Sequence, residues 1–150
     1  MPNVAGRRAA IPPALVLALS LTACTLGNEA DPIGLTSLED PIFLVQTEAA
    51  AAVMEALFDG PIAADDAGCV RLQPSGATVV WPFGFSLREV GGQHYVIDGS
   101  NRSIGRIGGD FRFGGGFVPT LHEGIPLDQS ARALAEDRCP GSYWIVGDVS

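Results

Sequence analysis

The side chains best suited to catalysis in this sequence are its two histidines, His94 and His122, and a nearby serine. Ser86 and His94 with an aspartate would be the raw material of a nucleophilic triad. However, the segment around Ser86 lacks the second glycine of a nucleophile elbow. Neither histidine has the spacing of a zinc site, so no metal and no cofactor are predicted. An exported hydrolase using His94 or His122 stays as the alternative to a non-catalytic protein.

Two acidic turns and a glycine run could hold ions. Asp65-Asp66 and Asp98 with Asn101 offer oxygen ligands for calcium, but the EF-hand spacing is absent and turn formation explains these residues. Gly114-Gly115-Gly116 could cradle an anion, yet no lysine, serine or threonine follows at P-loop spacing. We therefore expect ordinary turns at the acidic residues, and a bend or bulge between two strands at the glycines.

The segment Trp81-Pro82-Phe83-Gly84-Phe85 is the best candidate for a binding surface. Most aromatic side chains of a small barrel must fill its interior. Here proline and glycine interrupt the strand, which favours a loop that carries aromatic rings to the surface. The rings of Trp81, Phe83 and Phe85 are therefore predicted to form a patch for a partner or ligand.

The first residues have the layout of an export signal. Arg7 and Arg8 precede a short apolar stretch from Ala14 to Ala23, which ends in small residues. About 20 continuous apolar residues are needed to span a membrane, and Pro12-Pro13 would break a longer helix. We therefore interpret residues 1–23 as a signal peptide.

Leu21-Thr22-Ala23-Cys24 resembles the lipobox of bacterial lipoproteins. The resemblance implies that Cys24 receives a diacylglyceryl group, and that the new amino terminus is acylated, for instance with palmitate, after residues 1–23 are removed. Such chains anchor stably because each buried methylene contributes about 0.8 kcal/mol. We expect lipid anchoring in the cell membrane or outer membrane, outside the cytoplasm, with residues 24–40 as lipidated cysteine and flexible tether. An ordinary secretory signal, or a twin-arginine signal at Arg7-Arg8, stays open.

If Cys24 is lipidated, Cys69 and Cys139 are the two cysteines that remain, and they allow one pairing. An exported domain meets an oxidising compartment, where such a pair commonly closes. We therefore predict a Cys69–Cys139 disulfide. Two separate buried thiols are the alternative.

The composition of the 150 residues excludes some partners. The chain is 47% apolar and 17% charged, with a formal charge of −8, and all nine of its basic residues are arginine. After loss of residues 1–23, seven arginines and seventeen acidic residues leave a formal charge of −10. Such a chain does not look like a nucleic-acid binder or a domain that adheres to anionic lipid. Attachment to the membrane is expected to come from the acyl chains.

The elements that must position these residues are mostly strands. Asp40 and Pro41 favour a helix from about 41 to 52, so residues 41–58 are interpreted as a helix or a helix-to-strand segment. In residues 59–150, breakers interrupt short apolar stretches every eight to twelve residues, which predicts a mainly β fold. The expected strands are 69–72, 77–81, 86–90, 94–97, 103–107, 110–113, 117–118 and 143–146, with a helix over 128–137. Closure removes exposed strand edges, so we predict a small closed or partly open β-barrel with one or two helices, of which an OB-like arrangement is one candidate.

Residues 55–148 are also similar to a set of small uncharacterised exported bacterial proteins. The shared residues are Gly68-Cys69-Val70, Trp81-Pro82-x-Gly84, Asp98-Gly99, Gly109-Asp110 and Gly114-Gly115-Gly116. The resemblance implies no activity. We therefore expect a lipid-anchored cell-envelope protein whose β-barrel is a non-catalytic module, either structural or binding an envelope protein.

Overall fold

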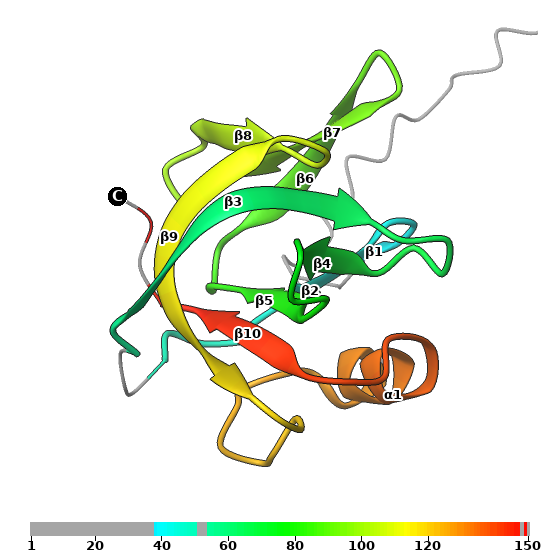
Figure 1. Ribbon diagram of the computed structural model, residues 1–150, viewed down its shortest axis with the longest axis vertical. Coiled ribbons are helices and arrows are strands. Elements are labelled where there is room, and N and C mark those ends of the chain that lie inside the picture. Colours follow the sequence, from blue (N-terminus) through cyan, green and yellow to red (C-terminus); the bar gives the residue numbers. More distant parts are fainter. Residues whose placement is uncertain (1–37, 51–53, 148, 150) are drawn as a thin grey trace, which may run out of the picture. The chain divides into compact units, whose positions relative to one another are not determined.

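Short strands dominate the described part of the chain, which comprises residues 38–50, 54–147 and 149 of a computed structural model (Figure 1). The predicted signal peptide, Cys24 and the tether up to residue 37 lie outside the described residues. Five strands form a barrel: β3 (Ala56–Ala64), β4 (Val70–Leu72), β5 (Thr78–Trp81), β9 (Asp110–Val118) and β10 (Tyr143–Val146). The other elements are β1 (Leu38–Glu39), β2 (Ile42–Val45), β6 (Ser86–Val90), β7 (Gln93–Ile97), β8 (Ser103–Arg106) and α1 (Gln129–Arg138).

The barrel closes in the strand order β3-β4-β5-β10-β9 and back to β3. Its pairings are antiparallel except for β5 and β10, which run parallel. The pair Arg71↔Thr78 completes the ring between β4 and β5. The predicted mainly β fold with a small barrel is confirmed, and the five-stranded ring agrees with the OB-like candidate.

The helix predicted from about 41 to 52 is wrong. Residues 42–45 form strand β2, which pairs with β5 in parallel, and residues 46–50 have no regular structure. All four side chains of β2 are buried: Phe43 and Val45 face the barrel interior, whereas Ile42 and Leu44 face a second cluster outside it. A strand buried on both faces has a continuous apolar run, so it lacks the alternation that identifies a strand in sequence.

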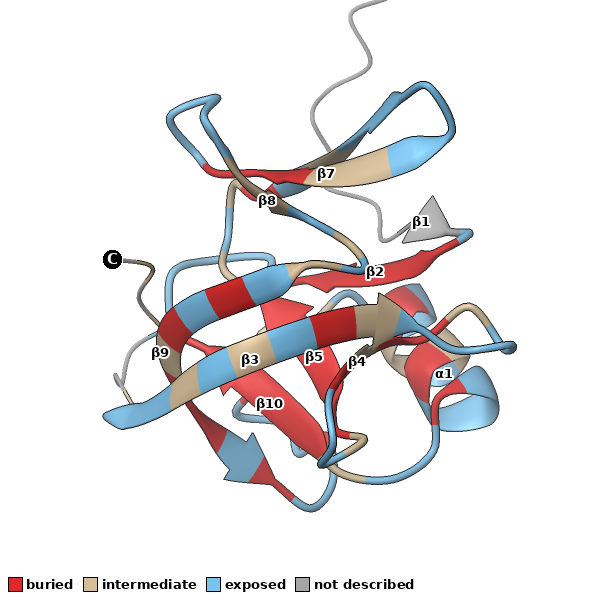
Figure 2. Ribbon diagram, turned by 45° about the horizontal axis from the view of Figure 1, so that its top comes forward, coloured by how far each residue is buried: buried red, intermediate tan, exposed pale blue. Residues whose placement is uncertain are grey.

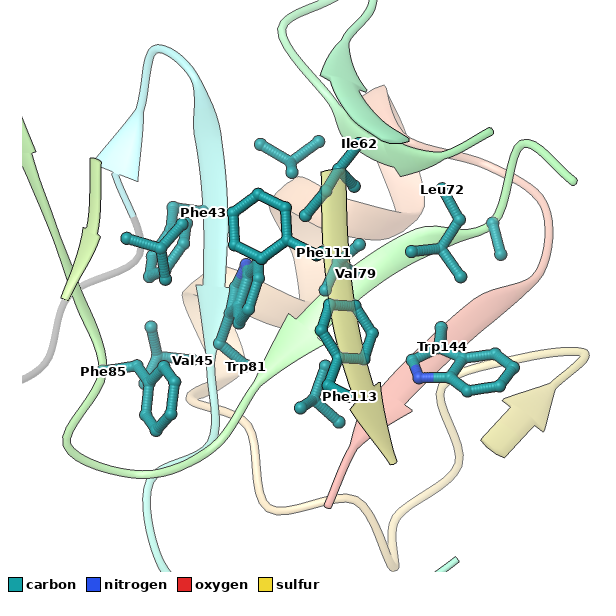
Figure 3. Close-up of a cluster of buried hydrophobic side chains, with 14 residues drawn as sticks. Phe43, Val45, Ile62, Leu72, Val79, Trp81, Phe85, Phe111, Phe113 and Trp144 are labelled. Carbon is teal, nitrogen blue, oxygen red and sulfur yellow. The ribbon is translucent and has the colours of Figure 1, made fainter. Parts of the chain in front are cut away.

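A cluster of aromatic rings fills the barrel interior (Figure 3). The indole of Trp81, which is fully buried, stacks on Phe43 at a centroid distance of 5.4 Å and on Phe85 at 6.0 Å. The ring of Phe113 meets the same indole edge-on at 5.6 Å. Such offset and edge contacts are the favourable geometries of aromatic pairs, so these rings hold three segments of the barrel together.

The helix α1 covers part of the outside of the barrel (Figure 1). The carboxylate of Asp128 caps its first turn by accepting hydrogen bonds from the backbone N–H of Ser130 and Ala131. The small buried side chains of Ala131 and Ala135 face the barrel wall. These residues pack with β2, β5 and β10 in the second cluster, so one face of the parallel strand pair is closed to solvent.

The predicted disulfide between Cys69 and Cys139 is confirmed. It joins the residue before β4 to the residue after α1, at a sequence separation of 70. Arg138, the last residue of α1, also donates a hydrogen bond to the carbonyl oxygen of Ala67. The helix is therefore fixed to the barrel at its C-terminal end.

The strands β6, β7 and β8 form a separate antiparallel sheet, inserted in the chain between β5 and β9 (Figures 1 and 2). Its inner face contributes Leu87 and Val96 to the interior cluster. Gly105 belongs to the same face, and a Cβ on it would lie 2.6 Å from the Phe111 ring. A side chain there would therefore push the sheet away from the barrel.

Candidate functional site

The loop between β5 and β6 carries the most exposed aromatic ring of the predicted patch. The backbone N–H of Phe85 donates to the carbonyl oxygen of Pro82, and Gly84 has a φ of +86°, a combination typical of a tight turn with glycine at its third position. This turn leaves Phe83 52% exposed, whereas Trp81 and Phe85 point into the barrel and are 0% and 8% exposed. A patch formed by all three rings is therefore wrong, because only Phe83 is available at the surface.

Beside Phe83 lies a hollow of about 180 Å³. It is lined by Gln46, Ala49, Ala50, Pro82, Phe83, Val146 and Gly147. The Gln46 side chain is 1% exposed, and its Nε2 donates to the carbonyl oxygen of Val146 at 3.2 Å. Its Oε1 is buried and accepts no hydrogen bond from any described residue. An unsatisfied buried acceptor is unfavourable, and here it belongs to a residue that lines the hollow.

Two further hollows are linked to this one through shared lining residues. The first, of about 220 Å³, shares Pro82 and Gly147 with it, and its other lining residues are Phe85, Asp98, Gly99, Ser100 and Val149. The second, of about 350 Å³, shares Val149 and is lined by Arg102, Ser103, Ile104, Asp110, Phe111 and Arg112. We call these three adjoining hollows the C-terminal groove, because residues of the segment 146–149 border each of them. The groove is apolar at its Phe83 end and charged at its Arg112 end.

The middle of the groove depends on two glycines and an aspartate. A Cβ on Gly84 would lie 3.5 Å from the Cα of Gly99, so the two loops approach closely there. The carboxylate of Asp98 accepts hydrogen bonds from the backbone N–H of Ser100 and Arg102, and an ion pair joins it to the Arg102 guanidinium at 2.8 Å. The hydrogen bond from the Arg102 backbone N–H is the main cause that lowers the pKa of Asp98. This carboxylate therefore stays charged and fixes the 98–102 turn.

The other acidic turn is built in the same way. The carboxylate of Asp65 accepts from the backbone N–H of Ala67 and Cys69 and pairs with the Arg71 guanidinium. Burial acts to raise the pKa of Asp65, but the hydrogen bonds from Arg71 and Cys69 outweigh burial and lower it. Asp65 and Asp98 thus serve the turns that the sequence predicted. Among the residues whose structure is described, no three His, Cys, Asp or Glu side chains gather into a metal site.

The predicted catalytic residues do not come together. Ser86 pairs with Ile97 across the β6–β7 ladder, whereas His94 pairs with Glu89. Cross-strand partners share a face and successive residues alternate, so Ser86 and His94 lie on opposite faces of this sheet. His122 is in the loop before α1, where its Nδ1 accepts a hydrogen bond from the backbone N–H of Gly124. These positions favour neither histidine as the base of a serine nucleophile.

The run Gly114-Gly115-Gly116 lies inside β9, where it allows close packing of neighbouring residues. The strand continues through residues 110–118, so the predicted interruption between two strands is wrong. A Cβ on Gly115 would lie 2.3 Å from the Ile145 carbonyl oxygen and 2.4 Å from the Trp144 Nε1. One on Gly116 would lie 2.3 Å from the sulfur of Met54. The glycines therefore leave space for side chains on both sides of the strand.

Sequence reasoning missed Gln46, Arg102 and Arg112 as residues of a candidate site. Gln46 was part of the wrongly predicted helix, and it meets Val146 across 100 positions of sequence. The two arginines line the groove only because β8 and β9 lie near each other in the fold. No local pattern marks such residues, since each is ordinary in its own segment.

The fold and groove define this part of the chain as a small disulfide-linked barrel domain with a surface groove. Comparison of the chain with protein-family models, with curated proteins and with solved structures found no match. None of the helices in the described ranges combines the length and the apolar composition that a transmembrane helix requires.

Proposed function

We propose that this chain is a lipid-anchored cell-envelope protein whose barrel is a non-catalytic binding module. The lipobox-like sequence Leu21-Thr22-Ala23-Cys24 supports attachment to the cell membrane or outer membrane through acyl chains on Cys24. The Cys69–Cys139 disulfide supports a location outside the cytoplasm, because thiols are kept reduced inside it. The ligand is a segment of an envelope protein that lies in the C-terminal groove.

The hollow beside Phe83 is the observation that carries the binding proposal. It combines an exposed aromatic ring with a buried amide oxygen that accepts no hydrogen bond from a described residue. An extended peptide can pack a side chain on Phe83, and its backbone N–H can donate to Gln46 once that side chain turns its Oε1 toward the hollow. The charged end of the groove, with Arg112, Asp110 and Arg102, adds selectivity for polar groups further along the same segment.

Site-specific photo-crosslinking tests this function in intact cells. A benzoylphenylalanine at position 83 should give one saturable protein adduct. The same group at position 57 should not, although Leu57 is exposed to a similar degree, 58% against 52%. Gln46→Leu should weaken the adduct without unfolding the barrel. Equal adducts at both positions, or an adduct that Gln46→Leu leaves unchanged, would reject the groove as the binding site.

The anchor is tested separately by flotation. The parent should float with vesicles of phosphatidylcholine, whereas Cys24→Ala should stay in the soluble fraction. Intact-mass measurement should show the acyl groups on the parent alone. A Cys24→Ala chain that still floats would refute the anchor and leave the groove proposal standing. The hydrolase alternative gains no support, because no observation in the described structure favours His94 or His122.

A further inference from the structure

The fold separates the charges of this acidic chain. Four of the seven arginines in the described ranges lie between residues 86 and 112: Arg88, Arg102, Arg106 and Arg112. Three acidic residues share this stretch, so its formal charge is +1. The rest of the described residues contain three arginines and eleven acidic residues, a formal charge of −8. The sheet β6–β8 and the start of β9 therefore form a basic end on an acidic body.

The outer face of the β6–β8 sheet contains no acidic side chain from its three strands. Arg88 pairs with Tyr95, and Tyr95 pairs with Arg106, so the three lie in one row across the sheet. The inner face, with Leu87 and Val96, packs on the barrel, which turns this row outward. Glu89 alternates onto the opposite face, where it pairs with His94 across the ladder and is exposed. Ile97, the cross-strand partner of Ser86, shares this face but is 3% exposed. We call the remaining set Ser86, Arg88, Val90, Gln93, Tyr95 and Arg106 the arginine face.

The guanidinium groups of the arginine face are exposed and can contact an external anion. Arg88 donates to the side-chain oxygen of Asn101 at 2.7 Å, and both Arg88 and Arg106 are exposed. No ion pair joins either of them to a carboxylate in the described ranges. Both can therefore bind an external anion without breaking an ion pair to a described carboxylate.

The β6–β7 hairpin adds an apolar tip to this face. Val90 is 57% exposed beside the Gly91-Gly92 turn, and the tip stands clear of the barrel (Figure 2). Tyr95, half-buried, lies behind it between the two arginines. An apolar tip, an aromatic ring and cations in this order are the components that bind a bilayer surface: apolar atoms enter the interface, and guanidinium groups meet phosphates.

We propose that the arginine face docks on an anionic phospholipid surface and so orients the anchored barrel. The inference depends on the lipid anchor proposed above. The net charge of −10 would oppose docking only if every acidic residue repelled the lipid surface. At physiological salt, charges further than about 8 Å from the surface are largely screened. Acidic residues at the far end of the barrel therefore contribute little when this face touches lipid. Each arginine near such a surface strengthens binding about fivefold.

Because the lipid anchor keeps the barrel near the membrane, even a low affinity of the arginine face for lipid is enough to orient the barrel. The segment between Cys24 and Leu38 has 13 residues, which span at most about 45 Å when fully extended. A domain held that close to the bilayer experiences a high effective concentration of lipid, so contacts that would fail in free solution become populated. Docking would leave the C-terminal groove, which is bordered by a different set of residues, available to a partner.

Quenching by brominated lipid tests the docked orientation. Val90→Trp in the acylated full chain places an indole at the tip, while the native Trp81 and Trp144, 0% and 3% exposed, give little background. Quenching should be strong in vesicles containing phosphatidylglycerol and absent in pure phosphatidylcholine. Leu57→Trp, a position flanked by Glu55 and Asp59, is the matched control and should show no quenching in either.

Charge variants complete the test. Arg88→Gln with Arg106→Gln should lower the docking equilibrium constant about twenty-fivefold, at fivefold per arginine, and Arg88→Lys with Arg106→Lys should preserve it. Equal quenching in the two vesicle types, or no effect of the glutamine pair, would overturn the proposal. So would an acidic protein crosslinked at position 90 in place of lipid. Failure of the lipid anchor is recognised separately, because the parent then does not float with phosphatidylcholine vesicles. Docking of the arginine face can still be measured in that case by tryptophan quenching at a higher concentration of phosphatidylglycerol vesicles.

Discussion

Removing the Cys69–Cys139 disulfide should cost this domain a large share of its stability. Cys69→Ala with Cys139→Ala is the appropriate change, because both positions are fully buried and serine would add unpaired hydroxyl groups. The cross-link closes a loop across 70 positions of sequence. The chain-entropy relation for such a loop gives about 4 kcal/mol, against a total of about 5–15 kcal/mol for typical domains.

The local structure adds to this loss. The fully buried residues of α1 are the two small side chains Ala131 and Ala135, and Leu134 is only partly buried against the same cluster, so apolar contact with the barrel is limited. Its other attachments at the C-terminal end are hydrogen bonds, from Arg138 to Ala67 and from the Tyr143 hydroxyl to the carbonyl oxygens of Ala135 and Cys139. We therefore expect α1 to detach before the barrel unfolds in the variant.

Urea unfolding followed by tryptophan fluorescence measures the effect, since Trp81 and Trp144 are both buried in the barrel. With a urea slope of about 2 kcal/mol per molar, the midpoint should fall by about 2 M. Reductant should bring the parent to the midpoint of the double variant and leave that variant unchanged. A midpoint shift below about 0.5 M, or a parent that does not respond to reductant, would refute the reasoning.

Three further predictions concern packing, pH and the candidate site. Gly115→Ala should lower the free energy of unfolding by about 1–3 kcal/mol because its Cβ would overlap β10, whereas Gly99→Ala, which meets only one atom at 4.0 Å, should be nearly neutral in the same urea titration. The lowered pKa of Asp65 stabilises the fold above about pH 4 and this contribution is lost as pH falls through the folded-state value, so unfolding midpoints of Asp65→Asn should depend less steeply on pH between 5 and 2. Trp81→Ala should cost about 3–5 kcal/mol, while Phe83→Ala should leave the melting temperature unchanged and remove partner binding; a large loss of stability in Phe83→Ala would contradict the surface position of this ring.

The strands that are bounded by turn-forming residues could be predicted from sequence. Residues 86–90 and 143–146 were predicted with the bounds that the structure has, and the predicted helix at 128–137 lies one residue before α1. Local rules were enough there, because turns with glycine or asparagine delimit the strands and Asp128 marks the helix start. The disulfide also followed from counting, since Cys69 and Cys139 had only one pairing once Cys24 was set aside.

The sequence predictions that were wrong concern residues whose structure depends on contacts distant in sequence. The stretch Ile42–Val45 is a strand because β5 and both clusters of buried side chains surround it, and nothing within the segment shows this. The aromatic patch failed for a related reason: a single turn at Pro82–Phe85 points one ring outward and two inward. The C-terminal groove joins residues from both ends of the described chain, so it was not visible in any local pattern.

The place of β10 in the barrel constrains how the molecule can be made. This strand, residues 143–146, sits between β5 and β9 and is the parallel partner of β5. A chain that has been synthesised or translocated only up to the residues before 143 contains the other four barrel strands, but its barrel is still open between β5 and β9. Folding must therefore wait for this strand, and until then the nascent chain exposes the unpaired edges of β5 and β9, where a chaperone could bind.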